Sequence, residues 1–177
     1  MSANDLIYYL GKLPWGLLGK PEEVILHWTA GSLGRKDFYR NAVYQKYHFN
    51  VLGDATVVQT LSVKDKGEHV AGRNSGKIGV TMCCMGSDAN GHPIQPTKMQ
   101  VERTARLVAE LCQELKIPLS KVFDHAHYAA LDGYSNLRWD VGSYYKVIIG
   151  KSKWYYAKLL LPKLFGGIEN SIKGKLR

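Results

Sequence analysis

The sequence lacks most of the features that mark secreted, membrane-spanning or fibrous proteins. It has three cysteines, two of them adjacent (Cys83 and Cys84), and no Cys-x-x-Cys pair, so neither a disulfide framework nor a thiolate metal site is expected. It contains no apolar run of about 18 residues. The N-terminus does not have the basic and apolar regions of a Sec signal peptide. We therefore expect a chain that folds in a reducing compartment with free, buried thiols.

Acidic residues are also scarce in a composition that is otherwise ordinary. The 177 residues are enough for one domain, and hydrophobic residues make up 45% of them. Only 15 Asp and Glu stand against 24 Lys and Arg, which gives a net charge of +9. A charge of this size favours an anionic partner, such as nucleic acid, a membrane surface or a bacterial wall polymer.

The positive charge is concentrated in the last 27 residues. Residues 151–177 contain seven Lys and Arg and a single acidic residue, Glu169, together with aromatic and aliphatic side chains such as Trp154 and Phe165. We therefore divide the chain into a domain at 1–150, on which residues 1–20 pack as an extension, and a basic amphipathic tail at 151–177. The tail is either a terminal helix that packs on the domain or an arm that lies on an anionic envelope surface.

Strand and helix patterns alternate along the domain. Strands are expected at 22–28, 47–52, 55–61, 77–84 and 121–125. Gly53 and Asp54 mark a hairpin between the second and third of these. Helices are expected at 35–46 and after Thr97, which forms a capping box with Gln100. This order predicts an α/β domain with a mixed central β-sheet flanked by helices.

Two histidines stand at the ends of predicted strands, where ligands gather in α/β sheets. They are His27 and His125, and a lone histidine in such a position is more often structural. Together with Asp140, however, two neutral imidazoles suit a zinc ion that keeps one coordination position open for water. A strand would point His127 to the same side as His125, so a three-histidine site is the alternative.

Four segments then occur in an order that resembles a known family. They are HWTAG (27–31), YHFNVLGDATVVQ (47–59), HVAGRNSGKIGV (69–80) and DHAHYAALDGY…LRWDVG (124–142). Together they resemble the zinc-dependent N-acetylmuramoyl-L-alanine amidases of the type 2 class, which includes phage endolysins, recycling amidases and peptidoglycan recognition proteins. The resemblance covers residues 22–142 and implies one domain of that fold with a zinc cofactor.

The resemblance also implies the metal ligands and the groups that act on the scissile bond. It places the zinc ligands at His27, His125 and Asp140. It implies that Arg138 stabilises the oxyanion with a fixed positive charge. Tyr47 would orient the attacking water and carry a proton to the leaving amine, as in the branch of the family that uses a tyrosine.

Three further positions complete the site that the resemblance implies. Substrate contacts fall on His69 and Asn74. His127 stands where the family has Glu, which is a departure from its pattern. His127 is therefore either an alternative proton carrier, because histidine titrates near neutral pH, or a residue that orients a ligand.

The implied activity is hydrolysis of the amide between N-acetylmuramic acid and the L-alanine of the stem peptide, by zinc-activated water. We expect peptidoglycan as the partner, no nucleic acid, and a monomer. The first hypothesis is a phage or prophage endolysin, made in the cytoplasm and acting on the cell wall after release; an exported effector is the second. The alternatives are a non-catalytic peptidoglycan-binding module and a cytosolic muropeptide-recycling amidase.

Overall fold

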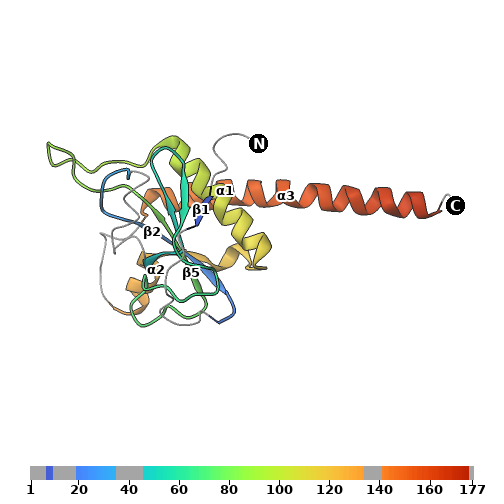
Figure 1. Cartoon of the computed structure of the whole chain (residues 1–177), viewed down its shortest axis with the longest axis horizontal. Coiled ribbons are helices and arrows are strands. Elements are labelled where there is room, and N and C mark those ends of the chain that lie inside the picture. Colours follow the sequence, from blue (N-terminus) through green and yellow to red (C-terminus); the bar gives the residue numbers. More distant parts are fainter. Residues whose placement is uncertain (1–6, 10–18, 35–45, 134–140, 176–177) are drawn as a thin grey trace.

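A mixed β-sheet forms the centre of the domain (Figure 1). The computed structural model describes residues 7–9, 19–34, 46–133 and 141–175, with side chains in 19–34, 46–133 and 141–161. The helix predicted at 35–46 lies outside these ranges except for its last residue, and Arg138 and Asp140 lie wholly outside them.

The described residues contribute six strands to the sheet, in the order β1-β4-β3-β5-β2-β6. The strands are β1 (Ile7–Tyr9), β2 (Glu23–Trp28), β3 (Phe49–Val51), β4 (Val57–Gln59), β5 (Lys77–Met82) and β6 (Val122–Asp124). Strands β3 and β4 form the predicted antiparallel hairpin, and the other neighbouring pairs are parallel. The predicted mixed sheet is therefore confirmed. Strand β1 is an addition at the edge, since the sequence predicted no strand before residue 22.

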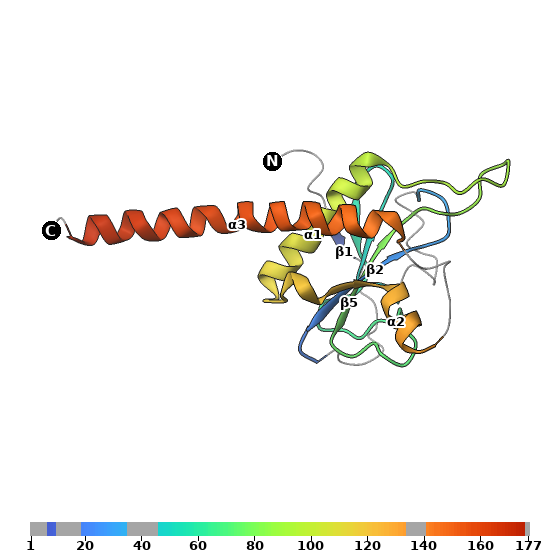
Figure 2. The same ribbon diagram turned by 180° about the vertical axis from the view of Figure 1, so that it is seen from behind.

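In the described ranges three α-helices accompany the sheet: α1 (Lys98–Glu114), α2 (His125–Leu131) and α3 (Ser143–Lys175), with a short 3-10 turn at Leu119–Lys121. The predicted capping box starts α1. The Thr97 hydroxyl accepts a hydrogen bond from the Gln100 N–H at 3.1 Å, and the Gln100 side chain accepts one from the Thr97 N–H at 3.2 Å. Helix α3 lies along α1, and both views show its C-terminal part projecting from the domain (Figures 1 and 2). No described helix is long and apolar enough to cross a membrane.

Strand β2 is buried on both faces, which explains its continuous apolar sequence. On one face, Val24 and Leu26 belong to the main core with α1. On the other face, Ile25 packs with Val70 and with Tyr128 of α2. Because successive side chains in a strand alternate, His27 shares the face of Ile25 and therefore points to the α2 side of the sheet.

All three cysteines are buried and unbridged, as predicted. Burial raises the pKa of the Cys84 and Cys112 thiols to about 12. Both thiols are therefore protonated at neutral pH, which leaves the reactive chemistry to the histidines.

Candidate active site

Three histidines and a tyrosine meet on the α2 side of the sheet. The ring centroid of His27 lies 5.0 Å from that of Tyr47, 5.2 Å from that of His69 and 5.3 Å from that of His125. All four side chains are buried. We call this group (His27, Tyr47, His69 and His125) the histidine cluster.

The strand order explains why residues so far apart in the sequence meet here. Strands β2 and β6 are parallel neighbours in which Leu26 lies opposite Asp124. The next residue of each segment, His27 or His125, therefore emerges at the same edge of the sheet. The expected meeting of these two histidines follows from that register.

His125 lies at the first position of α2 rather than on a strand. The predicted strand at 121–125 ends at Asp124, whose side chain caps the helix by accepting a hydrogen bond from the His127 N–H at 3.1 Å. Residues two apart in a helix point about 200° apart, so His125 and His127 face different sides. The strand geometry on which the three-histidine alternative depended is therefore wrong. His127 is exposed and stacks on Phe123, with 4.2 Å between ring centroids.

His69 fixes the orientation of His27. The Nε2 atom of His69 lies 3.2 Å from the backbone carbonyl oxygen of Lys77, and a carbonyl can only accept. In a neutral ring the Nδ1 atom of His69 is then the acceptor, and it lies 3.2 Å from Nε2 of His27. His27 therefore donates from Nε2, which leaves its Nδ1 atom unprotonated with a lone pair.

Burial keeps this pair neutral. Desolvation lowers the pKa of His27 well below its usual value, and the neighbouring His69 and His125 lower it further. Desolvation, followed by the neighbouring His48, lowers the pKa of His69 to about 3. Neutral imidazole is the form of histidine that binds a metal ion, so the lowered pKa keeps His27 in a ligating state at neutral pH.

His48 packs against the ring of His69. His48 accepts a hydrogen bond at Nδ1 from the Gly79 N–H and donates from Nε2 to the Asp65 carbonyl, both at 2.9 Å. Both ring nitrogens are thus used by the backbone, and desolvation lowers the pKa of His48 to about 4. His48 therefore has a structural position.

Two glycines, which the sequence reading did not single out, make room for the His69 ring. A Cβ atom on Gly79 would lie 2.8 Å from Cδ2 of His69, and one on Gly67 would lie 2.9 Å from the same atom. These separations are shorter than real Cβ contacts, so a larger residue at either position would push the ring aside. For Gly79 the sequence contained an indication, because a glycine inside a strand often marks a position where another group approaches the backbone closely.

Asn74, the other predicted substrate contact, shapes the loop that carries His69. Its Oδ1 atom accepts hydrogen bonds from the backbone N–H groups of His69 at 2.9 Å and Val70 at 2.7 Å. The loop is joined to the end of α2 by Arg73, whose Nε and Nη2 atoms lie 3.0 and 2.5 Å from Oδ1 of Asp132. The same loop thus contacts both the cluster and the helix that begins with His125.

Tyr128 anchors α2 to the sheet. Its hydroxyl donates a hydrogen bond to the Glu23 carboxylate. The Nζ atom of Lys77 lies 3.3 Å from the same carboxylate and 5.1 Å from the centroid of the Tyr128 ring. Burial, followed by the bond to Glu23, raises the pKa of Tyr128 above its usual value. These contacts hold α2, and with it His125, in place.

A sequence profile of the N-acetylmuramoyl-L-alanine amidases (Amidase_2) matches residues 18–142 of this chain, which include the whole histidine cluster. The chain belongs to this amidase family. The resemblance drawn from the four sequence segments is therefore confirmed, and so is the predicted enzyme class. No curated protein sequence matches the amidase.

Solved structures of amidases and endolysins share its fold. The N-acetylmuramoyl-L-alanine amidase LysC from Clostridium intestinale is 16% identical, with a TM-score of 0.61 over 82% of this chain and 96% of its own. The Ph2119 endolysin from a Thermus scotoductus bacteriophage is 18% identical, with a TM-score of 0.59 over 83% and 99%. A mutant endolysin from Bacillus subtilis is 20% identical, with a TM-score of 0.57 over 83% and 98%.

The donor set of the amidase fits a zinc ion as far as the structure describes it. His27 and His125 offer two buried imidazoles, which are typical zinc ligands. Among the described residues no group of three potential ligands occurs, and the predicted third ligand, Asp140, lies outside them. Arg138, the predicted oxyanion-stabilising residue, also lies outside them.

Proposed function

We propose that this amidase hydrolyses the bond between N-acetylmuramic acid and L-alanine with a zinc ion held by His27, His125 and Asp140. The observation that carries the proposal is the approach of His27 and His125, whose ring centroids lie 5.3 Å apart in a buried site. Bound zinc supplies a Lewis acid that polarises the scissile carbonyl and lowers the pKa of water to about 7.

The surrounding side chains then position and stabilise the reacting groups. The Nδ1 atom of His69 accepts a hydrogen bond from Nε2 of His27, so that His27 keeps one tautomer and one orientation. Arg138 places a fixed positive charge where the carbonyl oxygen becomes negative. In this proposal His69, a member of the cluster, and Asn74, which accepts a hydrogen bond from the His69 N–H, also contact the stem peptide or the sugar.

Tyr47 is the proton carrier in this proposal. Its ring is buried beside His27, whereas His127 is exposed and stacked on Phe123. We expect Tyr47→Phe to lower turnover on a muropeptide by about 100-fold, within the usual range for general acid–base groups. His127→Ala is expected to leave turnover within a few fold of wild type. A larger loss of turnover in His127→Ala than in Tyr47→Phe would assign the proton-carrier role to His127.

The ligand set is tested by metal content together with product analysis. Elemental analysis of the purified protein is expected to give about one zinc per chain. His27→Ala and Asp140→Ala should lose zinc and hydrolysis, whereas His92→Ala, in an exposed loop, should keep both. Mass spectrometry of digested peptidoglycan would show stem peptides released from muramic acid. Retained zinc and activity in His27→Ala would refute the ligand assignment.

We propose the role of a phage or prophage endolysin, made in the cytoplasm and released to the wall. The support is the shared fold with proteins described as endolysins. Such an enzyme should digest polymeric sacculi about as well as soluble muropeptides. A strong preference for soluble muropeptides would favour a recycling amidase, and binding without cleavage would favour a recognition module. Export through a secretion system would favour an effector. Sedimentation of the free protein should give the mass of a monomer.

A further inference from the structure

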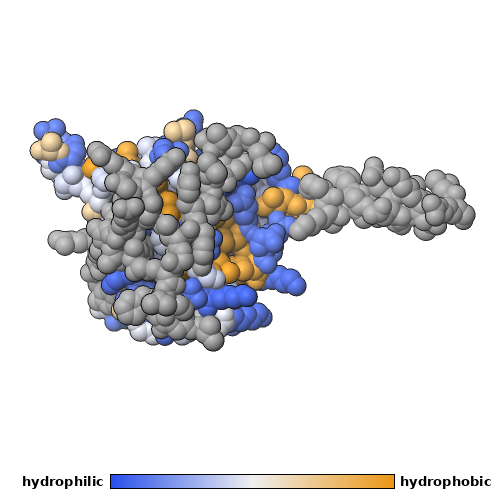
Figure 3. All heavy atoms as spheres, in the orientation of Figure 1, coloured by the Kyte–Doolittle hydropathy of each residue, from blue (hydrophilic) through white to orange (hydrophobic). Residues whose placement is uncertain are grey.

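Exposed hydrophobic side chains gather on α1 and α3, away from the histidine cluster. Among the described residues, six large hydrophobic side chains are exposed, and five of them lie on these two helices: Met99, Val147, Trp154, Leu160 and Leu161. The sixth, Leu131, lies on α2. Figure 3 shows hydrophobic and hydrophilic residues side by side at the base of the projecting helix. This concentration marks a surface suited to contact with something other than water.

A pocket of about 360 Å³ opens between the two helices on this surface. Its walls include Lys98, Met99, Glu102, Arg103, Arg106 and Tyr155. A second pocket, of about 320 Å³, also includes Glu102 and extends to Lys151 and Trp154. Because both pockets share Glu102, they form one continuous surface, which we call the α1–α3 face.

The charges of the α1–α3 face favour an anionic occupant. Both nearby carboxylates among the described residues are already paired: Glu102 with Lys151 at 2.6 Å, and Glu110 with Arg106 at 2.9 Å and with Arg103 at 3.6 Å. Cations therefore outnumber carboxylates on this face. Arg103 is only 7% exposed, and its Nη1 atom lies 3.6 Å from the Glu110 carboxylate, an ion pair too long for a hydrogen bond. Its Nε and Nη1 atoms thus have no hydrogen-bond acceptor in the described part of the chain. A buried guanidinium with unmet donors is costly, and an anion in the pocket would reduce that cost.

The outer side of α3 adds an apolar stripe with flanking lysines. Val147, Trp154 and Leu161 recur every seven residues, while Ile148 and Ser152 face α1. Lys158 lies over the Trp154 ring, with its Nζ atom 5.0 Å from the ring centroid. A tryptophan ring beside a lysine combines an apolar body with a positive charge, and such side chains are favoured where an apolar phase meets water.

A second copy of the chain fits this surface less well than a lipid surface. Two copies would bring lysines and arginines together, since the carboxylates of the face are engaged within the same chain. A bilayer of anionic phospholipid offers both complements, an apolar interior for Trp154 and phosphate groups for the cations.

We propose that the α1–α3 face docks the enzyme on an anionic phospholipid surface, with Trp154 in the interface and lipid phosphate groups at the pocket of Lys98 and Arg103. This inference deepens the proposed function by naming the envelope partner of the C-terminal helix. It does not depend on catalysis, because its readout is binding.

The test is co-sedimentation of the full chain with vesicles of phosphatidylglycerol and phosphatidylcholine, compared with vesicles of phosphatidylcholine alone. Wild type should bind the anionic vesicles at least about tenfold more tightly, and added salt should weaken the binding. Trp154→Ala and the double variant Lys98→Glu/Lys158→Glu should each reduce binding on the order of tenfold. All variants should cleave soluble muropeptide at the wild-type rate, whereas failure of the proposed function would appear as lost cleavage with binding intact.

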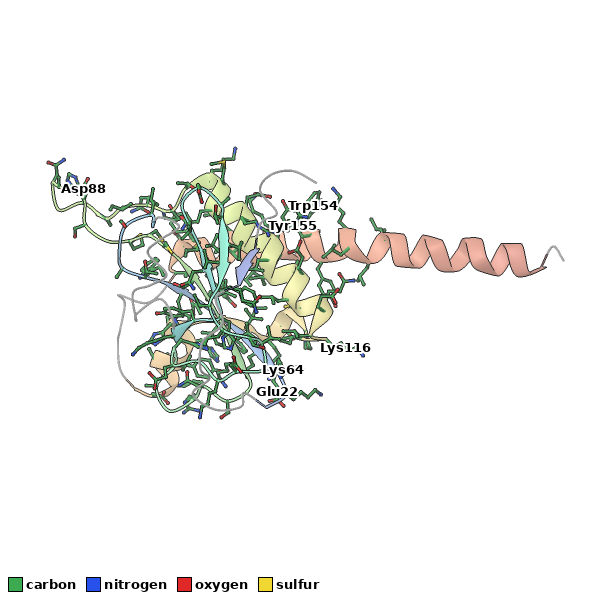
Figure 4. The ribbon with its side chains drawn as sticks, viewed as in Figure 1. Glu22, Lys64, Asp88, Lys116, Trp154 and Tyr155 are labelled. Carbon is green, nitrogen blue, oxygen red and sulfur yellow. The ribbon has the colours of Figure 1, made fainter. Side chains whose placement is uncertain are left out.

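Matched controls separate the face from general charge and hydrophobicity. Leu131→Ala removes an exposed apolar side chain outside the face, and Lys20→Glu/Lys64→Glu reverses the same number of charges. In Figure 4, Lys64 and Glu22, which is two residues after Lys20 in the sequence, lie far from Trp154 and Tyr155. Both controls should bind like wild type. Equal binding to neutral vesicles, equal losses in the controls, or self-association that Trp154→Ala abolishes without any vesicle binding would each overturn the proposal.

Discussion

The backbone N–H of Gly79 donates a hydrogen bond to Nδ1 of His48 at 2.9 Å, and the same glycine leaves the space that the His69 ring fills. One residue of β5 therefore supports two histidines at once. His69 in turn contacts His27, a proposed zinc ligand. The geometry of the site thus depends on a backbone position that carries no side chain.

Gly79→Ala should impair the site more than the fold. Its Cβ atom would lie 2.8 Å from Cδ2 of His69, so the ring must shift from its present position beside His27. We expect kcat/KM on a muropeptide to fall by about 10- to 100-fold, because small displacements of catalytic groups are costly. Gly150→Ala is the control, since a Cβ there meets nothing within 4 Å. Equal activity of the two variants would show that the position of His69 is unimportant.

His48 should make stability fall with acidity. Its pKa is about 4 in the folded protein, below the ordinary value of 6.5, so the unfolded chain binds the proton more readily. The stabilisation is therefore complete above pH 6.5 and is lost as the pH falls towards 4. The full effect is about 3 kcal/mol.

Chemical denaturation at several pH values measures this effect. In His48→Gln the titrating group is absent, while an amide can still donate and accept hydrogen bonds. The difference in unfolding free energy between wild type and the variant should therefore shrink or change sign between pH 6.5 and 4. A difference that stays constant over this range would show that His48 does not titrate on unfolding.

Asn74 should act through loop structure as well as through substrate. Asn74→Ala removes the acceptor of two backbone N–H groups, which should cost about 1–3 kcal/mol of unfolding free energy. Asn74→Asp keeps the acceptor, so it should restore stability. If the amide also donates to substrate, Asn74→Asp will have a raised KM at wild-type stability. Wild-type unfolding free energy and wild-type KM in Asn74→Asp would show that Asn74 has a structural role alone.

Only the part of α3 up to Leu161 should stabilise the fold. This part includes Ser152, which donates to the Ala105 carbonyl at 3.0 Å, and Tyr155, which donates to Glu102 at 2.5 Å. Truncation after Gly150 removes these contacts with α1 and should lower the thermal midpoint by several degrees. Truncation after Leu161 should leave the midpoint within about 2 °C of wild type. Equal loss in both variants would place the stabilising contacts beyond residue 161.

The elements that were predicted well are those with strong local signals. The capping box of Thr97 and Gln100 and the buried strand that contains His27 depend on short sequence patterns, and both appear as expected. The capping box and the strand needed no knowledge of distant contacts. The convergence of His27 and His125 was expected from their positions at strand ends, and it depends on β2 and β6 being neighbours in the sheet.

The remaining features depend on contacts that a local pattern does not contain. The sequence placed His125 on a strand, but Asp124 caps a helix there, and this changes the direction of His127. The contact of His69 with His27 depends on the glycines that face it from other segments. The division at residue 150 likewise fell inside one continuous helix, because charge changes there while the backbone conformation does not.

That continuous helix also determines where an added protein module would sit. A helix rises about 1.5 Å per residue, so the residues of α3 after Leu161 extend the chain by about 20 Å. A fluorescent protein or affinity partner fused to the C-terminus would therefore be held clear of the histidine cluster, on a spacer that the enzyme already supplies.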